Sequence, residues 1–162
     1  MEPNPFVSTK EPATLADIQA IEQEYHFTLP EDYKAHLLVH NGGWPTRKIF
    51  LQQNEDGSQT AQKISDFKSV KHGPSKLERS LGLLHDQLHP HLVPFGSETG
   101  GDLFTLSVGP EDYGSVYYIS HEAYKPPKKK ERQLPRQYGK GVSLLASSFT
   151  AFMAGLVAGQ AS

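Results

Sequence analysis

The sequence contains no cysteine. This absence excludes disulfide bonds, thiolate nucleophiles, iron–sulfur ligation and cysteine-ligated zinc, so the fold must be stabilised by packing. No stretch approaches the ~18 apolar residues that a membrane-spanning helix needs. The opening residues 1–5 also lack the basic and apolar regions of a secretory signal. We therefore expect a cytoplasmic protein without a membrane contact.

Motifs of several enzyme classes are also missing. The sequence has no Gly-x-Ser-x-Gly nucleophile elbow, so serine-hydrolase chemistry has no support. The glycines of Gly96-x-x-x-Gly100-Gly101 resemble a phosphate loop, but no Lys-Ser or Lys-Thr pair follows, and the segment leads into a predicted strand instead of a helix. We therefore predict a protein that is not an enzyme and binds no cofactor.

Charge is distributed unevenly along the 162 residues, a length that fits one domain. The formal net charge is −2, but residues 125–141 contain seven basic side chains and one acid, a net charge of +6. The rest of the chain carries −8. Because residues 125–141 are also rich in proline and have no periodic apolar face, we predict a mobile basic loop there on an acidic body.

Four segments carry apolar residues at helical spacing, at about residues 14–25, 30–40, 75–89 and 143–157. Thr14 and Ser75 each stand three residues before an acid, which is the pattern of a capping box. Asn41-Gly42-Gly43 ends the second segment with residues that tolerate positive φ. We therefore predict four helices, preceded by a flexible N-terminal arm at about residues 1–13.

Short apolar runs between turn residues predict antiparallel strands. Residues 49–51 and 61–67 flank a turn-rich connection and predict a β-hairpin. Three further runs lie at residues 92–96, 103–108 and 116–119. Since turns of a few residues join these runs, consecutive strands are expected to pair in a meander. The predicted fold class is α+β, a single domain with an antiparallel sheet of about five to six strands flanked by helices.

Three histidines form the strongest candidate for metal chemistry. His85 and His89 are four residues apart with Asp86 between them, and His91 follows. Histidines at this spacing on a helix can bind one metal ion, and the pattern is close to His-Glu-x-x-His. Asp86 is shorter than the expected Glu, however, and Pro90 ends the helix. His85, His89 and His91 are therefore weak metal ligands by pattern, and a solvated helix end is the favoured interpretation.

Acidic and aromatic residues gather in the predicted turns at the ends of the strands. Acids beside exposed aromatic rings are typical of protein-binding surfaces, where the rings anchor and the acids steer a basic partner. The candidate partner-binding residues are Trp44, Glu98, Asp102, Glu111, Asp112, Tyr113, Tyr117 and Glu122. A nuclease, which must bind phosphates, would present a complementary basic face.

Two series of motifs occur in a specific order. The first is Ile21-Glu22-x-x-Tyr25, Leu29-Pro30-Glu31-Asp32-Tyr33 and Asn41-Gly42-Gly43. The second is Val93-Pro94-Phe95-Gly96, Gly100-Gly101-Asp102-Leu103-Phe104 and Val116-Tyr117-Tyr118-Ile119-Ser120-His121-Glu122. In this order the motifs resemble the SUKH (Smi/Knr-like) superfamily. The resemblance covers most of residues 14–122 and implies a SUKH-like fold. It also implies an architectural role for Leu29, Pro30, Asn41, Gly42, Gly43, Gly101 and Asp102.

The resemblance implies a non-catalytic, protein-binding role. The family is known chiefly for immunity proteins that bind and block bacterial toxins, many of them nucleases, and for a fungal regulator of cell-wall synthesis. We therefore expect an immunity protein that binds a basic toxin domain and makes no direct contact with nucleic acid. Two alternatives stay open, namely a regulatory adaptor and a metal-dependent hydrolase that uses His85, His89 and His91.

Overall fold

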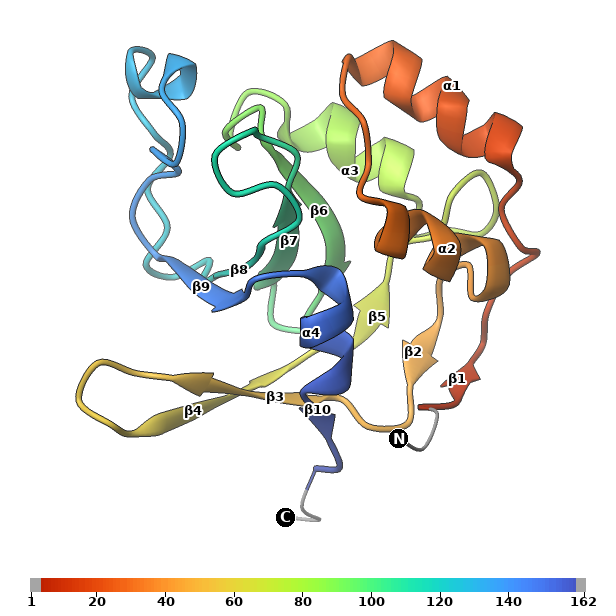
Figure 1. The fold of residues 1–162 in the computed structure, drawn as a ribbon, viewed down its shortest axis with the longest axis horizontal. Coiled ribbons are helices and arrows are strands. Elements are labelled where there is room, and N and C mark those ends of the chain that lie inside the picture. The colour runs from red at the N-terminus through yellow and green to blue at the C-terminus, as the bar shows by residue number, and fades with distance from the viewer. Residues whose placement is uncertain (1–3, 160–162) are drawn as a thin grey trace.

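A five-stranded antiparallel sheet forms the centre of the computed structural model, which describes residues 4–159 (Figure 1). Its strands, in order, are β5 (Asp66–Phe67), β6 (Leu92–Ser97), β7 (Leu103–Ser107), β8 (Val116–Ile119) and β9 (Val142–Ala146). Strands β6, β7 and β8 pair consecutively, which confirms the predicted meander. Nearly every residue of these three strands is buried, and this explains their almost continuous apolar runs.

A second, three-stranded sheet contains the predicted hairpin. Its strand order is β10 (Leu156–Val157), β3 (Ile49–Gln53) and β4 (Gln59–Lys63). The β3–β4 hairpin extends away from the body of the molecule (Figure 1). The second predicted run, residues 61–67, divides between two sheets, because Ile64 turns into the core and is fully buried. The remainder of that run is β5, which pairs with β6.

The first two predicted helices are confirmed as α1 (Leu15–Tyr25) and α2 (Glu31–Val39). The capping box at the start of α1 is present. The Thr14 hydroxyl accepts a hydrogen bond from Asp17 N, and the Asp17 carboxylate accepts one from Thr14 N, both at 3.1 Å. Both helices therefore begin where local sequence chemistry places them.

The third helix, α3 (Leu77–Leu84), is shorter than the predicted segment, which extended to about residue 89. It has no side-chain cap. The Ser75 hydroxyl instead donates to the Asp66 carboxylate at 2.8 Å, and the Glu78 carboxylate accepts from Lys71 N at 2.7 Å. The predicted capping box is wrong because both of its side chains have tertiary partners.

The prediction of one closing helix over residues 143–157 is wrong. Residues 142–146 form β9 on the edge of β8, and only α4 (Phe149–Ala154) is helical before the chain enters β10. The Ser148 hydroxyl caps α4 by accepting from Ala151 N at 3.0 Å. The open edge of β8 offers backbone partners to the first half of the segment, and this outweighs its helical spacing.

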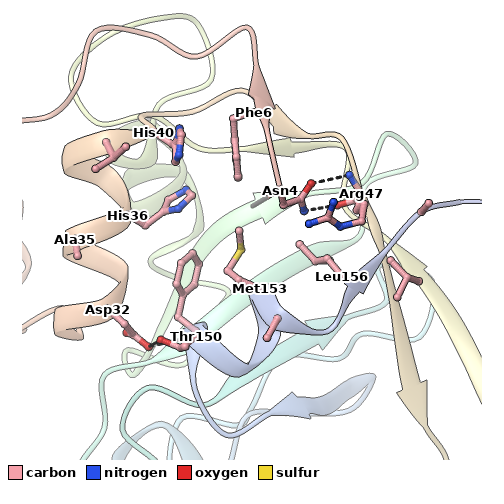
Figure 2. A pocket seen from close by; sticks show the side chains of 15 residues that line it. Asn4, Phe6, Asp32, Ala35, His36, His40, Arg47, Thr150, Met153 and Leu156 are labelled. Carbon is pink, nitrogen blue, oxygen red and sulfur yellow. Dashed lines mark hydrogen bonds between the residues drawn. The ribbon is translucent and has the colours of Figure 1, made fainter. Parts of the chain in front are cut away.

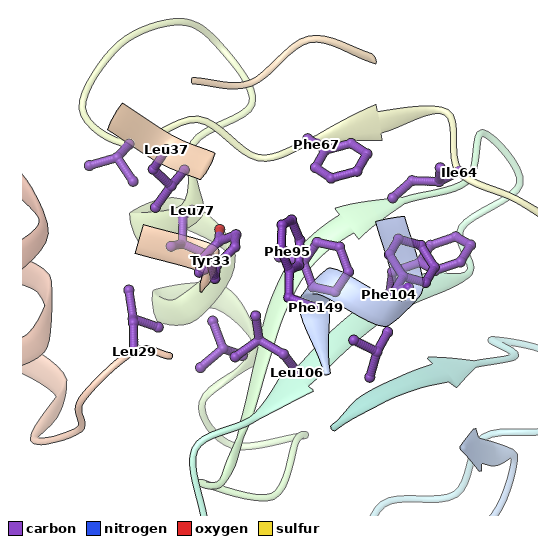
Figure 3. Packing of buried hydrophobic residues seen from close by; sticks show 14 of the residues in the cluster. Leu29, Tyr33, Leu37, Ile64, Phe67, Leu77, Phe95, Phe104, Leu106 and Phe149 are labelled. Carbon is purple, nitrogen blue, oxygen red and sulfur yellow. The ribbon is translucent and has the colours of Figure 1, made fainter. Parts of the chain in front are cut away.

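Aromatic packing joins the central sheet to α2 and α4 (Figure 3). The ring of Phe149 meets Tyr33 of α2 edge-on, with centroids 5.1 Å apart, and lies 5.5 Å from Phe95 of β6. Phe95 also contacts Phe67 and Phe152. This cluster places α2 and α4 side by side. No helix within residues 4–159 has the length and apolar character to cross a membrane.

The N-terminal arm, residues 4–11, runs along the outside of this body. Its strand β1 (Phe6–Val7) pairs antiparallel with β2 (Trp44–Pro45). The arm rejoins the body where Lys10 N donates to Asn41 O at 2.7 Å. The Asn41 side chain also donates to Glu11 O at 2.7 Å.

The basic loop, residues 125–141, has contacts that its sequence did not indicate. Reciprocal backbone hydrogen bonds between Lys125 and Lys140, at 3.0 and 3.1 Å, close its base, and the 3-10 helix η1 (Glu131–Gln133) lies within it. Tyr138 is buried, and its hydroxyl donates to the Asp112 carboxylate at 2.7 Å. The loop is thus joined to the turn between β7 and β8.

A candidate partner-binding groove

A groove of about 920 Å³ lies between α2, α4, the N-terminal arm and β10, and we call it the α2–α4 groove (Figure 2). Its walls are mostly apolar or aromatic. The lining residues are Asn4, Phe6, Asp32, Ala35, His36, Val39, His40, Arg47, Phe149, Thr150, Met153, Ala154, Leu156, Val157 and Ala158.

His36 of α2, His40 just after α2 and the arm form one wall. The Phe6 ring stacks on His40, with centroids 4.9 Å apart and planes inclined by 14°, and meets His36 edge-on at 4.9 Å. His36 also contacts Phe149, and its Nε2 atom is buried without a hydrogen-bond partner. Burial, with a further contribution from the nearby His40, lowers the pKa of His36 to about 3. The His36 ring is therefore neutral near pH 7.

Polar side chains hold the two ends of the groove. The Asp32 carboxylate accepts hydrogen bonds from the backbone and hydroxyl of Thr150, at 3.0 and 2.9 Å, and so joins the start of α2 to the start of α4. At the other end, the Asn4 side chain donates to Arg47 O at 2.9 Å and accepts from Arg47 N at 2.8 Å. The α2 and α4 walls are therefore held together, and the arm is bonded to Arg47.

Apolar side chains are exposed at the rim. Val39 is 65% exposed and Val157 is 39% exposed, although each lies beside buried neighbours. An apolar concavity with a few fixed polar groups is the usual composition of a binding site. The arrangement suits the insertion of apolar side chains from a partner.

Three predicted site residues lie together at one end of the central sheet. Asp102 accepts hydrogen bonds from the Tyr118 hydroxyl and from both the backbone and the ring of His121. Burial acts to raise the pKa of Asp102, but these hydrogen bonds outweigh it and hold the pKa below its usual value. The bond to Asp102 raises the pKa of His121. Glu98 and the exposed Glu122 lie on the adjoining turns, and their charges also act to raise the pKa of His121.

Two other predicted residues, Asp112 and Tyr117, are buried, each with 8% of its surface exposed. The Asp112 carboxylate accepts hydrogen bonds from Ser107, Tyr117 and Tyr138, at 2.6, 2.5 and 2.7 Å. Both residues therefore lack the exposed surface that a partner contact requires, and their role in a binding surface is corrected to an internal one. The residue types of Asp112 and Tyr117 do not indicate by themselves that these side chains are buried.

The remaining predicted residues lie elsewhere. Glu111 and Tyr113 are exposed on the turn between β7 and β8, at the opposite end of β7 from Asp102, and the Tyr113 hydroxyl donates to Thr28 O at 2.7 Å. Trp44 is in β2, with the Lys48 ammonium 5.8 Å from its ring centroid. The structure therefore does not bring the eight residues together on one surface.

The three candidate metal ligands do not converge. His89 is buried, with Nε2 2.8 Å from Leu134 O, and its Nδ1 accepts from His91 N at 3.0 Å. His85 is exposed and pairs with Asp86 at 3.1 Å. Because α3 ends at Leu84, these side chains do not share a helical face. Within residues 4–159, no group of three or more His, Asp or Glu side chains is arranged to hold a metal ion.

The α2–α4 groove was not predicted, since its lining comes from four segments that are distant in the sequence. One signal was available. Val39 lies off the helical face that Tyr33 and Leu37 bury, and an apolar residue outside the buried stripe indicates an exposed apolar patch.

Comparison with known proteins agrees with the fold. The model of the SMI1/KNR4 family (SUKH-1) matches residues 12–155, which include α1 to α4 and the central sheet. No curated protein matches the chain significantly. The family match supports a non-catalytic domain of the immunity or regulator type that interacts with other proteins. The chain belongs to the SMI1/KNR4 family, SUKH-1.

Proposed function

We propose that this chain is an immunity protein that neutralises a cognate bacterial toxin in the cytoplasm by direct binding. The α2–α4 groove carries the proposal, because it combines exposed apolar side chains at its rim with α2 and α4 walls that the hydrogen bonds between Asp32 and Thr150 hold in place. Preorganised walls lower the conformational entropy that is lost on binding. No step of this function requires catalysis.

The charge distribution supports a basic partner. Outside residues 125–141 the chain carries a net charge of −8. An acidic body attracts a basic domain, such as a nuclease that binds phosphates, and accelerates its association. The basic loop lies on the opposite side of the molecule from the arm and β10 (Figure 1). The loop is therefore placed where it does not oppose the approach of a basic partner to the groove.

Acids of the predicted set, of which Glu111 and Glu122 are exposed and Glu98 and Asp102 partly buried, offer a second contact for the same partner. Glu98, Asp102 and Glu122 at one end of the sheet, and Glu111 at the other, remain proposed contributors to steering. Since exposed charges act mainly through the rate of association, their loss is expected to slow binding more than it speeds dissociation.

The test uses the toxin domain encoded beside the gene. Cells that express this chain should survive induction of that toxin, and the purified proteins should bind one to one with an affinity that falls as salt rises. Val39→Arg should weaken binding by about tenfold or more, because it places a charge at the apolar rim. Leu83→Arg is the matched control, since Leu83 is equally exposed (65%) but does not line the groove.

Two results would overturn the proposal. One is that cells expressing the chain are no more resistant than cells without it to every toxin domain encoded nearby. The other is that the chain binds a partner whose activity does not change, which would indicate a regulatory adaptor. Equal losses of affinity for Val39→Arg and Leu83→Arg would be compatible with an immunity function, but would show that the toxin does not bind in the groove.

A further inference from the structure

The N-terminal arm covers one wall of the α2–α4 groove with a single apolar side chain. Phe6 is half-buried and packs on His36, His40 and Phe67, whereas Pro5 and residues 7–9 are exposed. The family match begins at residue 12, so the arm lies outside the part of the chain that matches the family. The arm thus rests on the surface of the part of the chain that matches the family.

Apart from the Phe6 ring, backbone pairing and hydrogen bonds hold the arm in place. Strand β1 pairs with β2 over two residues, Pro5 O accepts from the backbone and the hydroxyl of Thr46 at 2.8 and 2.9 Å, and the Asn4 side chain makes its two bonds to Arg47. The firm attachment is further along the chain, where Lys10 and Glu11 bond to the buried Asn41. Between these points Ser8 has a φ of 56°, a conformation that non-glycine residues rarely adopt. Among residues 4–7, only the Phe6 side chain packs against the hydrophobic core, so displacement of this segment would cost the Phe6 contacts and these hydrogen bonds.

The seated arm also shows which chemistry this surface accepts. It is an extended segment that pairs antiparallel with β2, and its aromatic ring contacts His36, His40 and Phe67. Strand addition of this kind uses backbone bonds for affinity and side-chain pockets for specificity. A partner segment with a phenylalanine or tyrosine at the same register would make the same contacts.

We propose that the arm occupies a docking site for the partner protein. An extended segment of the partner, carrying an aromatic side chain, displaces the arm and binds in its place. The arm then competes with the partner, so the apparent affinity of the site is reduced by the fraction of time that the arm is seated. This inference rests on the proposed function for the biological partner, but the docking site itself can be tested without any toxin.

The probe is a fluorescent peptide with the sequence of residues 4–10, added to the full-length chain. Phe6→Ala in the protein removes the competing ring, so the peptide should bind this variant about tenfold or more tightly than the wild type. Asn4→Ala, which removes the two hydrogen bonds to Arg47 but leaves the Phe6 ring in place, should give a smaller increase. Val7→Ala is the control, because Val7 is 44% exposed and points away from the groove wall that Phe6 fills.

Trp44 supplies an internal reporter, since it is the single tryptophan of the chain and pairs with Val7. Acrylamide should quench Trp44 fluorescence more in Phe6→Ala than in the wild type, and saturating peptide should restore the wild-type level. A peptide in which Phe is replaced by Ala should have no effect.

The arm would be shown to be a permanent part of the fold if the peptide bound neither the wild type nor Phe6→Ala. Equal binding to the wild type, Phe6→Ala and Asn4→Ala would lead to the same conclusion. If the peptide binds as expected but the toxin is not neutralised, the proposed function fails and the docking site stands. If the toxin is neutralised but the peptide does not bind, only the displaceable arm is rejected.

Discussion

Asp112 is a buried carboxylate that joins three parts of the chain through Ser107, Tyr117 and Tyr138. Burial acts to raise its pKa, but the three hydroxyl donors outweigh burial and hold the pKa below its usual value. The same burial, together with the Asp112 charge, raises the pKa values of both tyrosines. The ionised carboxylate is therefore the form that stabilises the fold.

Asp112→Asn should lower the free energy of unfolding at pH 7 by about 2 kcal/mol, because one acceptor oxygen becomes a donor facing two hydroxyls. A depressed native pKa contributes stability above the unfolded pKa, and this contribution is lost as pH falls through the native value. The wild type should therefore lose more stability than the variant below about pH 4. Urea denaturation at several pH values measures this, with the exposed Glu111→Gln as control. Parallel pH profiles for wild type and Asp112→Asn would contradict it.

His36 makes a second pH-dependent contribution, which is also lost as pH falls but at higher pH. Its native pKa of about 3 lies below the ordinary value of 6.5, so the unfolded chain binds a proton that the folded chain excludes as pH falls between these values. Replacing it with phenylalanine, a ring of similar size, removes that titration. The wild type should lose about 2 kcal/mol more than His36→Phe between pH 7.5 and pH 5.

The measurement is again urea denaturation, with the variant first checked for wild-type cooperativity at pH 7.5. Identical losses of stability in the two proteins over this range would show that His36 is protonated in the folded state. Such a result would also mean that the groove wall carries a positive charge in mild acid.

The pairing of β1 with β2 depends on Gly43. Gly43 has a φ of 76°, and a Cβ there would lie 2.3 Å from Val7 O. Gly43→Ala should therefore detach the arm, raise acrylamide quenching of Trp44, and destabilise the fold by more than backbone strain alone. Gly57→Ala is the matched control, because its φ of 88° is similar but no atom lies within 4 Å of the added Cβ. The control should lose only about 1 kcal/mol. Equal quenching in the two variants would contradict the prediction.

Local signals predicted the elements that local contacts stabilise. The Thr14–Asp17 capping box and the Pro30 start of α2 are satisfied within a few residues, so α1 and α2 appear where the sequence placed them. The prediction of a helix over residues 143–157 was wrong because the first part of this apolar segment also suits a strand that pairs with β8. Whether this segment forms a strand or a helix depends on the free edge of β8, which lies more than twenty residues earlier in the chain.

Charge is separated across the whole molecule. The basic loop projects from one side and the α2–α4 groove opens on another (Figure 1). Reversing the charge of Lys128, Lys129 and Lys130 together should therefore leave the dissociation rate of the toxin complex unchanged and raise its association rate modestly. Stopped-flow association with the cognate toxin measures both rates, and Val39→Arg provides the contrasting case. A tenfold faster dissociation of the triple variant would place the loop in the interface.

The candidate sites differ in how far they were predictable. The histidines at residues 85–91 and the eight acidic and aromatic residues were selected for their chemistry, but chemistry does not indicate whether a side chain is buried. Asp112 and Tyr117 turned inward because Ser107 and Tyr138 offer them partners. The groove had no sequence motif, because its walls come from both ends of the chain and from α2.

The sequence by itself determined the fold class, the first two helices, the meander, the family and the charge asymmetry. These follow from periodicity, turn chemistry and the order of motifs, all of which are local or additive along the chain. Only the tertiary structure decided which carboxylates are internal, how the basic loop is joined to the sheet, and where an apolar surface stays open. These features depend on contacts between segments that are distant in the sequence. Such contacts can bury an acid or expose an apolar side chain, which is the reverse of what the residue type alone suggests.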